Sequence, residues 1–292
     1  MRGAHIAGWD RRRANARIAL RRGAITSIAP TLEDAIIKAD LVILAAPLRA
    51  IEALIPRVLR IARSGALVLD VGPLKQRVVA IALKHLRVRP TSSGRDHRSR
   101  DHRSRDYRDG AAFVAGHPMA GRERSGPQAA SADLFEGRPF ALYAPEQPKR
   151  ELARRKARAV VSAIGALPVW LEPHAHDRAV ASTSALPQLA AIALALATQR
   201  TLGRRHHKLA GPGFESATRL ADSPFHVWDT AMFGNAKNVR RALDALRRQL
   251  ADLAALLARG RRTEMAKRFR AAATVRRRIL ATPHRRKGAR HS

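Results

Sequence analysis

The sequence contains no cysteine and few aromatic residues, and each scarcity excludes a class of function. Without cysteine the chain forms no disulfide, binds no metal through thiolates and has no cysteine nucleophile. This fits a reducing compartment, and we expect a cytoplasmic protein. Aromatic residues make up 4% of the chain. The stacking surfaces on which single-stranded nucleic acids bind are therefore scarce.

Long apolar runs are missing as well. No stretch reaches the roughly 20 uninterrupted apolar residues of a membrane span, and the N-terminus lacks the apolar core of a signal peptide. We therefore expect no membrane partner. The hydrophobic fraction of 46% over 292 residues is nevertheless ordinary, which predicts a folded protein with two medium-sized domains.

Positive charge is in large excess, with a formal net charge of +33. A field of this size attracts polyanions whatever the fold, so a basic protein associated with nucleic acid is one alternative. No zinc-finger or aromatic RNA-binding signature accompanies the charge. Many arginines lie in helix-like stretches such as Arg11–Arg13. We interpret them as a solvated surface that binds polyanions nonspecifically. Retention of the protein on heparin would then be lost at moderate salt.

Short aliphatic runs alternate with helical patterns through the first half of the chain, as is typical of a parallel sheet wrapped by helices. The predicted strands are 5–8, 41–45, 66–70, 113–115, 140–143 and 169–171. The predicted helices between them are 11–22, 31–38, 48–62 and 75–86. Thr31 with Asp34 resembles a capping box at the start of the second helix. Beyond Pro173, alanine- and leucine-rich stretches at 184–198 and 235–257 predict long helices.

This change of pattern predicts an α/β fold class with two domains. Residues 1–172 are expected to form a Rossmann-like parallel-sheet domain, and residues 173–281 an all-helical domain. Within the first, residues 94–110 contain a charged five-residue repeat that cannot bury an apolar face, which predicts a disordered insertion. Residues 282–292 are expected to form a basic, solvated tail.

An acidic residue, Asp10, follows the first predicted strand. In a dinucleotide-binding fold, an acid at the end of the second strand accepts hydrogen bonds from the adenosine ribose hydroxyls. A carboxylate there also repels the extra phosphate of NADP, so Asp10 predicts NAD as the cofactor. Because the basic residues Arg11–Arg13 follow directly, NADP stays open as the alternative cofactor. After the strand at 41–45, the small turn residue Ala46 lets the backbone approach a cofactor, and Pro47 stiffens the exit.

The glycine loop that should precede Asp10 is not found. The pattern G-x-G-x-x-G is expected about 20 residues before the acid, and counting back passes Met1. Gly3 cannot belong to this loop, because no strand precedes it. Three explanations stay open: a start codon assigned too far downstream, a fragmentary or decayed gene, and a different fold. Without the loop we expect weak cofactor binding. Translating the DNA upstream of Met1 in frame would distinguish these explanations.

The most specific string in the chain is GHPMAGRERSG at Gly116–Gly126. It places His117 directly after a strand, at the carboxyl end of the sheet where α/β folds bind ligands. The string resembles the active-site loop of the prephenate dehydrogenase family. The resemblance implies NAD-dependent oxidative decarboxylation of prephenate to 4-hydroxyphenylpyruvate in tyrosine biosynthesis. It also implies a homodimer built by the helical half.

The resemblance assigns roles to residues of the first half. His117 is expected to accept the substrate's hydroxyl proton, since an imidazole titrates near neutrality. Glu123 stands at the place of the family's loop acid, where it orients a substrate-facing or cationic group or is a surface carboxylate. The string VLDVGPLK at Val68–Lys75 resembles the family pattern D-V-G-S-x-K. Pro73 replaces its serine, and Gly72 is expected beside the cofactor.

The helical half carries the expected substrate groups. Residues 211–221 resemble the family pattern G-x-x-F-x-x-x-T-R-[IL]-A, whose arginine, here Arg219, grips the ring carboxylate. Trp228 follows at the family's spacing. The family's S-H-L-P-H is SALPQ in this chain, so Ala185 and Gln188 replace two histidines. Gln188 can hydrogen-bond but cannot titrate. This leaves an arogenate dehydrogenase and a non-catalytic remnant as alternatives.

Overall fold

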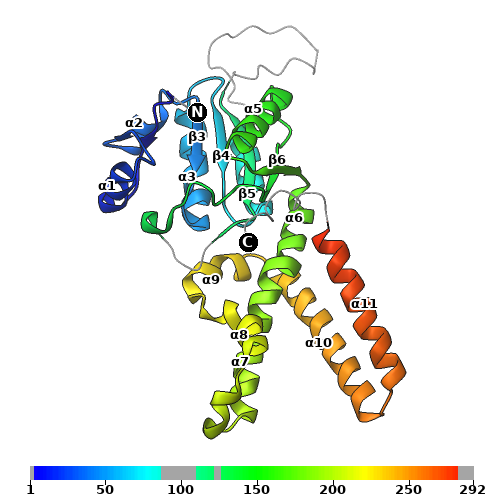
Figure 1. The fold of residues 1–292 in the computed structure, drawn as a ribbon. Coiled ribbons are helices and arrows are strands. Elements are labelled where there is room, and N and C mark those ends of the chain that lie inside the picture. The colour runs from blue at the N-terminus through cyan, green and yellow to red at the C-terminus, as the bar shows by residue number, and fades with distance from the viewer. Residues whose placement is uncertain (1–2, 87–109, 122–125, 282–292) are drawn as a thin grey trace, which may run out of the picture. The chain divides into compact units, whose positions relative to one another are not determined.

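The computed structural model describes residues 3–86, 110–121 and 126–281. The chain divides into two compact units, Met1–Pro173 and His174–Ser292. They are called the α/β unit and the helical unit below (Figure 1). The predicted fold class is confirmed, since a Rossmann-like sheet with helices precedes a helical unit. The predicted insertion, apart from Gly110, and the predicted tail lie outside the described residues.

The strands of the α/β unit form two sheets in the part of the chain that is described. They are β1 (Ala7–Gly8), β2 (Ser27–Ile28), β3 (Leu41–Leu44), β4 (Leu67–Asp70), β5 (Ala112–Pro118), β6 (Pro139–Tyr143) and β7 (Leu167–Trp170). Strand β1 pairs with β2 in a small parallel sheet, while the other strands follow the order β3-β4-β5-β6-β7. The break between β1 and β3 lies where a dinucleotide-binding fold has the strand that leads to its glycine loop.

One pairing departs from the parallel sheet that the sequence predicts. Strand β6 runs antiparallel to β5, with His117 opposite Ala141, whereas the other pairs are parallel. Parallel pairing needs a crossover connection, usually a helix. In the described part of the β5–β6 connection the structure has only a short 3-10 turn, η1 (Pro127–Ala129). The chain therefore returns along β5 in the opposite direction.

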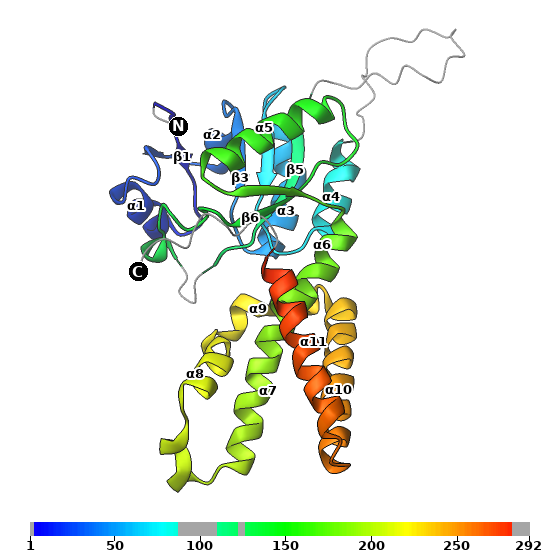
Figure 2. The same ribbon diagram turned by 45° about the vertical axis from the view of Figure 1, so that its right-hand side comes forward.

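Helices cover both faces of the larger sheet. They are α3 (Leu48–Ile61), α4 (Gln76–Leu86) and α5 (Arg150–Ala163), while α1 (Arg13–Arg21) and α2 (Leu32–Ile36) accompany the small sheet. Leu67 and Leu69 of β4 pack with α5 in one buried cluster. Because side chains alternate along a strand, Val68 and Asp70 face the other side, where α3 and α4 pack against each other (Figures 1 and 2).

The capping box predicted at the start of α2 is confirmed. The Thr31 hydroxyl accepts a hydrogen bond from the Asp34 backbone N–H at 3.1 Å, and the Asp34 carboxylate accepts one from the Thr31 N–H at 3.2 Å. This arrangement satisfies donors that the first helical turn leaves unpaired.

The helical unit contains two long antiparallel helices and a third that is interrupted near its start. Its helices are α6 (Pro173–Val180), α7 (Leu186–Thr201), α8 (Pro212–Thr218), α9 (Phe225–Phe233), α10 (Ala236–Ala258) and α11 (Arg262–Leu280). Short 3-10 turns are η3 (Arg204–Leu209) and η4 (Arg219–Asp222). Helices α10 and α11 lie side by side (Figure 2).

A π-helical turn, η2 (Ala181–Ala185), joins α6 to α7. In this turn the Leu186 N–H donates to the carbonyl of Ala181, five residues earlier, whereas an α-helix bonds four residues back. The cause is Pro187, which has no N–H and whose ring crowds the preceding turn of a regular α-helix.

The combined helical run Pro173–Thr201 is long and apolar enough to span a membrane by length and composition alone. Of its apolar 18-residue stretch, 28% is buried inside the protein.

We predict that Gly116→Ala lowers the free energy of unfolding by about 1–3 kcal/mol, because overpacking a tight site forces neighbouring atoms apart. A Cβ at Gly116 would lie 2.7 Å from the Asp70 carbonyl oxygen and 2.8 Å from Cε1 of Phe140. Urea denaturation measures the change. Gly121→Ala is the control, since its added Cβ meets nothing within 4 Å. Equal stability of the two variants would contradict the packing described.

Candidate functional site

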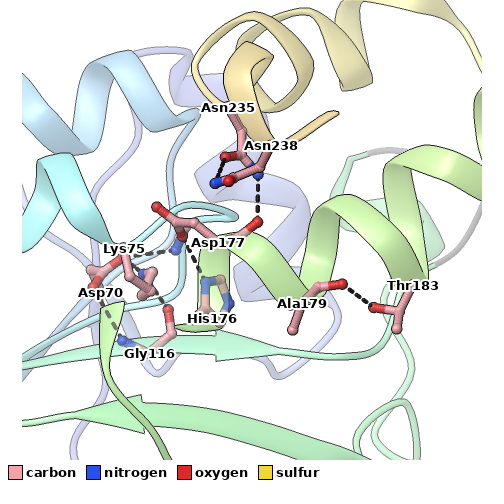
Figure 3. Close-up of polar contacts among 10 residues, drawn as sticks. Asp70, Lys75, Gly116, His176, Asp177, Ala179, Thr183, Asn235 and Asn238 are labelled. Atoms are coloured by element: carbon pink, nitrogen blue, oxygen red, sulfur yellow. Dashed lines mark hydrogen bonds and ion pairs between the residues drawn. The ribbon is translucent and has the colours of Figure 1, made fainter. Parts of the chain in front are cut away.

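The carboxyl ends of β4 and β5 meet around a buried ion pair. The Nζ of Lys75 lies 2.5 Å from Oδ2 of Asp70 and donates to the Gly116 carbonyl oxygen, also at 2.5 Å. Asp70 in turn accepts a hydrogen bond from the backbone N–H of Gly116 at 3.1 Å (Figure 3). It accepts another from the backbone N–H of Gly72 at 2.9 Å. Both side chains are buried, at 0% and 2% exposure. One pair thus links the end of β4, the following turn and β5.

Burial raises the pKa of Asp70, because the charged carboxylate loses its water. The Lys75 ammonium and the N–H groups of Gly72 and Gly116 oppose that rise. The ion pair is therefore held in a setting where neither partner is well solvated. Removal of one partner alone would leave an uncompensated buried charge.

His117 follows Gly116 at the end of β5. It pairs with Ala141 of β6, and its side chain is partly exposed. The next residues are anchored as well, since the Met119 N–H donates to the Pro139 carbonyl at 2.8 Å. His117 is therefore a partly exposed residue on a fixed strand, at the edge of the sheet where α/β folds generally bind ligands.

Asp10 lies at the end of β1, beside a cavity of about 490 Å³. Its carboxylate accepts hydrogen bonds from the Arg12 backbone N–H at 2.7 Å and from Nδ2 of Asn15 at 3.2 Å. These bonds hold the entry into α1. The lining also includes Trp9, Arg11 and Arg13. The cavity therefore combines one carboxylate with two guanidinium groups and an aromatic ring.

The other cofactor residues predicted in this unit lie in the turns after β3 and β4. Ala46 is half-buried, and Pro47 is the residue before the first turn of α3. Gly72 is buried, and a Cβ there would lie 3.2 Å from Oδ2 of Asp70 and from Cδ1 of Ile51. Its N–H is bonded to Asp70, so Gly72 fits the ion pair closely. Contact of these three residues with a cofactor stays a prediction.

Glu123, predicted as the loop acid, lies outside the described residues. Its role stays a prediction.

Arg219, Gln188 and Trp228 all belong to the helical unit. Gln188 is 1% exposed and donates from Nε2 to the Leu220 carbonyl at 2.7 Å. It therefore braces η4, the turn that begins with the exposed Arg219. Within the described residues, the Gln188 carbonyl oxygen and Nε1 of Trp228 are buried without a hydrogen-bond partner. Such atoms are places where water or a ligand is expected.

The helical unit also contains a buried polar cluster, which the sequence analysis did not predict as a site. Nδ1 of His176 lies 2.8 Å from Oδ1 of Asp177, and Nδ2 of Asn235 donates to the Asp177 carbonyl at 2.6 Å (Figure 3). The cluster ties α6 to the residue before α10.

Sequence reasoning also missed Asp70 and Lys75 as site residues. The available signal was an acid at the end of an apolar strand with a lysine five positions later. Charged residues in such a buried setting are rare unless they are paired. The structure brings Asp70, Gly72, Lys75 and Gly116 together beside His117, while Asp10 lies at the separate small sheet.

Comparison with known families gives two matches. The model described as prephenate dehydrogenase, nucleotide-binding domain, matches residues 1–93 and 100–169. The model described as prephenate dehydrogenase, dimerization domain, matches residues 172–271. Together they cover most of the chain.

Among curated relatives, a probable prephenate dehydrogenase of Streptomyces niveus is 39% identical over 148 residues, covering 50% of this chain and 40% of that protein. The prephenate dehydrogenase of Lactococcus lactis is 26% identical over 254 residues, covering 85% and 63%. The chain thus spans less than two thirds of the length of either relative.

Among solved structures, prephenate dehydrogenase from Aquifex aeolicus, in complex with hydroxyphenyl propionate and NAD+, has a TM-score of 0.77 at 24% identity, covering 95% of this chain and 90% of that one. Synechocystis arogenate dehydrogenase has a TM-score of 0.76 at 22% identity, covering 95% and 92%. At these identities the likeness concerns the fold, and this fold occurs in proteins with either name.

Proposed function

This chain belongs to the prephenate dehydrogenase family, and on that premise we propose that it is an NAD-dependent oxidoreductase. The proposed reaction converts prephenate to 4-hydroxyphenylpyruvate and carbon dioxide, a step of tyrosine biosynthesis. The observation that carries the proposal is the partly exposed His117 at the carboxyl edge of the sheet, directly after the buried and fully bonded Gly116.

The α/β unit contains groups that suit NAD. The cavity beside Asp10 offers a carboxylate for ribose hydroxyls and the Trp9 ring for a purine, at the carboxyl end of β1. The turns with Ala46, Pro47 and Gly72 follow β3 and β4 at the corresponding edge of the larger sheet. We assign NAD to these residues. When bound, NAD accepts the hydride that leaves the hydroxyl-bearing ring carbon.

His117 is the proposed proton acceptor. Loss of hydride requires that the hydroxyl oxygen give up its proton, and the neutral imidazole takes it. The bond between the ring and its carboxylate then breaks, and carbon dioxide leaves. The electron pair of that bond completes the aromatic ring and places negative charge on the oxygen. The proton held by His117 returns there to form the phenol.

Arg219 is the proposed partner of the ring carboxylate. A guanidinium can donate two parallel hydrogen bonds to a carboxylate, which fixes the orientation of the ring. Gln188 supports this role because its side chain holds the carbonyl of Leu220, the residue after Arg219. Trp228 and Glu123 complete the proposed substrate set.

Arogenate dehydrogenase activity is the second candidate. Arogenate carries an amino group where prephenate has a keto group, so polar residues near this end of the substrate decide between the two. Gln188 is neutral at every pH, and its buried carbonyl oxygen has no partner among the described residues. That oxygen would accept a hydrogen bond from an ammonium group. Turnover of arogenate and prephenate, compared as kcat/KM, distinguishes the two.

We expect His117→Asn to lower kcat for NADH formation from prephenate by about 100-fold or more, the contribution typical of a positioned general base. Absorbance of NADH measures the rate. His85→Asn, on the exposed side of α4, is the control and should match the unaltered protein. Equal turnover in the two variants would refute the role of His117.

We expect Arg219→Ala to raise KM for prephenate by about tenfold or more, with the Kd of NAD nearly unchanged, since the proposed partner of this arginine is the ring carboxylate of the substrate. Steady-state kinetics and NAD titration measure the two constants. Arg200→Ala changes another exposed arginine of the helical unit and should leave both unaltered. Loss of NAD binding in Arg219→Ala would contradict the assignment.

The helical unit is proposed to form a homodimer. Its exposed apolar side chains include Leu250 and Leu257 of α10 and Phe269 and Ile279 of α11, each at least 58% exposed. Large exposed apolar areas mark association surfaces. This dimer would also cover apolar positions of the run 173–201, such as Leu196 at 56% exposure.

Sedimentation equilibrium should give a mass of about 64 kDa, twice the 32.0 kDa of the chain, for a closed two-fold dimer. Leu257→Glu combined with Phe269→Glu should shift the mass toward the monomer, because charge is depleted from interface cores. Ile37→Glu combined with Ile43→Glu places the same two charges at exposed apolar positions of the α/β unit and should leave the dimer intact. A monomeric unaltered protein would end this proposal.

A further inference from the structure

Strand β5 extends beyond its pairing with β4. The ladder pairs Leu67, Val68 and Leu69 with Ala112, Phe113 and Val114. Gly116, which lies further along β5, is paired on its other side with Leu142 of β6. On the β4 side, the partners of Gly116 are side chains rather than backbone.

Those side chains are Asp70 and Lys75. The Asp70 carboxylate accepts the Gly116 N–H at 3.1 Å, and the Lys75 ammonium donates to the Gly116 carbonyl at 2.5 Å. Both backbone groups of this residue are thereby bonded as they would be by a neighbouring strand. The two side chains also bond to each other, so neither bond to Gly116 shifts independently of the other.

We propose that Asp70 and Lys75 are positioning residues for His117. Their ion pair replaces a strand at Gly116 and fixes the backbone from which the imidazole extends. The role of His117 as proton acceptor belongs to the proposed function, and the inference rests on it to that extent. The bonds of the pair to Gly116 and Gly72 are bonds to backbone groups, so the proposed effect on His117 is transmitted along the strand.

The surroundings explain why side chains serve here. Gly116 has no room for a Cβ, since Asp70 O and Phe140 Cε1 lie too close. The strand is therefore tightly enclosed at this point, and a charged pair gives strong, directed bonds without added bulk. A displacement of about 1 Å at a reacting group can lower a rate by about 100-fold. Accurate placement of His117 therefore has a large kinetic effect.

The test uses the double variant Asp70→Asn/Lys75→Met, which removes both charges and keeps similar volumes. A matched neutral pair tolerates burial better than one uncompensated charge, so this variant is expected to fold, whereas Lys75→Met alone leaves the Asp70 carboxylate as an uncompensated buried charge. We expect kcat for prephenate to fall by about 10- to 100-fold, with KM and the Kd of NAD changing by less than about threefold.

The control variant is Glu33→Gln/Arg57→Met. This pair of the same unit has the same 2.5 Å separation but is exposed, at 38% and 53%. Its kcat should equal that of the unaltered protein. An unchanged kcat in the Asp70/Lys75 variant, or an equal loss in both variants, would overturn the positioning role.

A second measurement does not depend on activity. Hydrogen exchange followed by NMR should show the Gly116 amide of the unaltered protein protected like the ladder amides of β5, and about tenfold or more less protected in the double variant. Val114, whose neighbour in β4 is Leu69, should keep its protection. A Gly116 amide that exchanges as fast as that of Gly121 in the unaltered protein would overturn the proposal without any variant.

The two measurements separate the failures. If the unaltered protein does not oxidise prephenate while Gly116 loses protection in the double variant, the proposed function is wrong and the ion pair still holds the strand. If prephenate is oxidised and the double variant has unaltered kcat, the positioning role is wrong and the function stands.

Discussion

The buried ion pair between Asp70 and Lys75 is the constraint on which the carboxyl edge of the sheet depends. Two charges without water persist in a protein only when they are paired and their remaining hydrogen-bonding capacity is used. Here the backbone of Gly72 and Gly116 supplies the further partners. Both residues are glycines at tight points, since a Cβ at Gly116 would overlap the Asp70 carbonyl oxygen and the Phe140 ring, and one at Gly72 would lie 3.2 Å from Oδ2 of Asp70. The pair, the two glycines and the position of His117 are therefore one structural unit.

Strand and helix periodicity allowed much of this fold to be predicted. Strands β3 and β4 are apolar runs, and the Thr31–Asp34 cap is a local pattern that needs no tertiary context. Strand β2 has two residues and forms only because β1 lies beside it, so local sequence contains little of it. Helix α5 was missed although Ala153, Ala157 and Val161 recur at helical spacing, because small side chains among many charges give a weak apolar pattern. The antiparallel direction of β6 depends on a connection, which periodicity does not describe.

Candidate-site residues that belong to a local sequence motif could be predicted, whereas those brought together only by the tertiary structure could not. His117 was found from a string, and the structure places it at the expected end of β5. Lys75 is the last residue of the string VLDVGPLK, and the string alone gives it no role. Only the geometry shows that Lys75 reaches Gly116, a residue 41 positions later. Likewise, Gln188 was expected to meet substrate, and the bond to Leu220 shows that its amide also supports the chain beside Arg219.

The net charge of +33 bears on association of the helical unit more than on its fold. Two copies with like charge repel, but salt at physiological strength screens exposed charges beyond about 8 Å. The charges at the contact itself then determine how strongly the two copies repel each other. On α11, exposed arginines alternate with Phe269, Val275 and Ile279, which are 71%, 43% and 60% exposed. An interface that buries these apolar side chains and leaves the guanidinium groups at its rim accommodates both features, because long basic side chains extend their charge into water. The comparisons give no support to polyanion binding, and a solvated rim of this kind needs no polyanion to explain it.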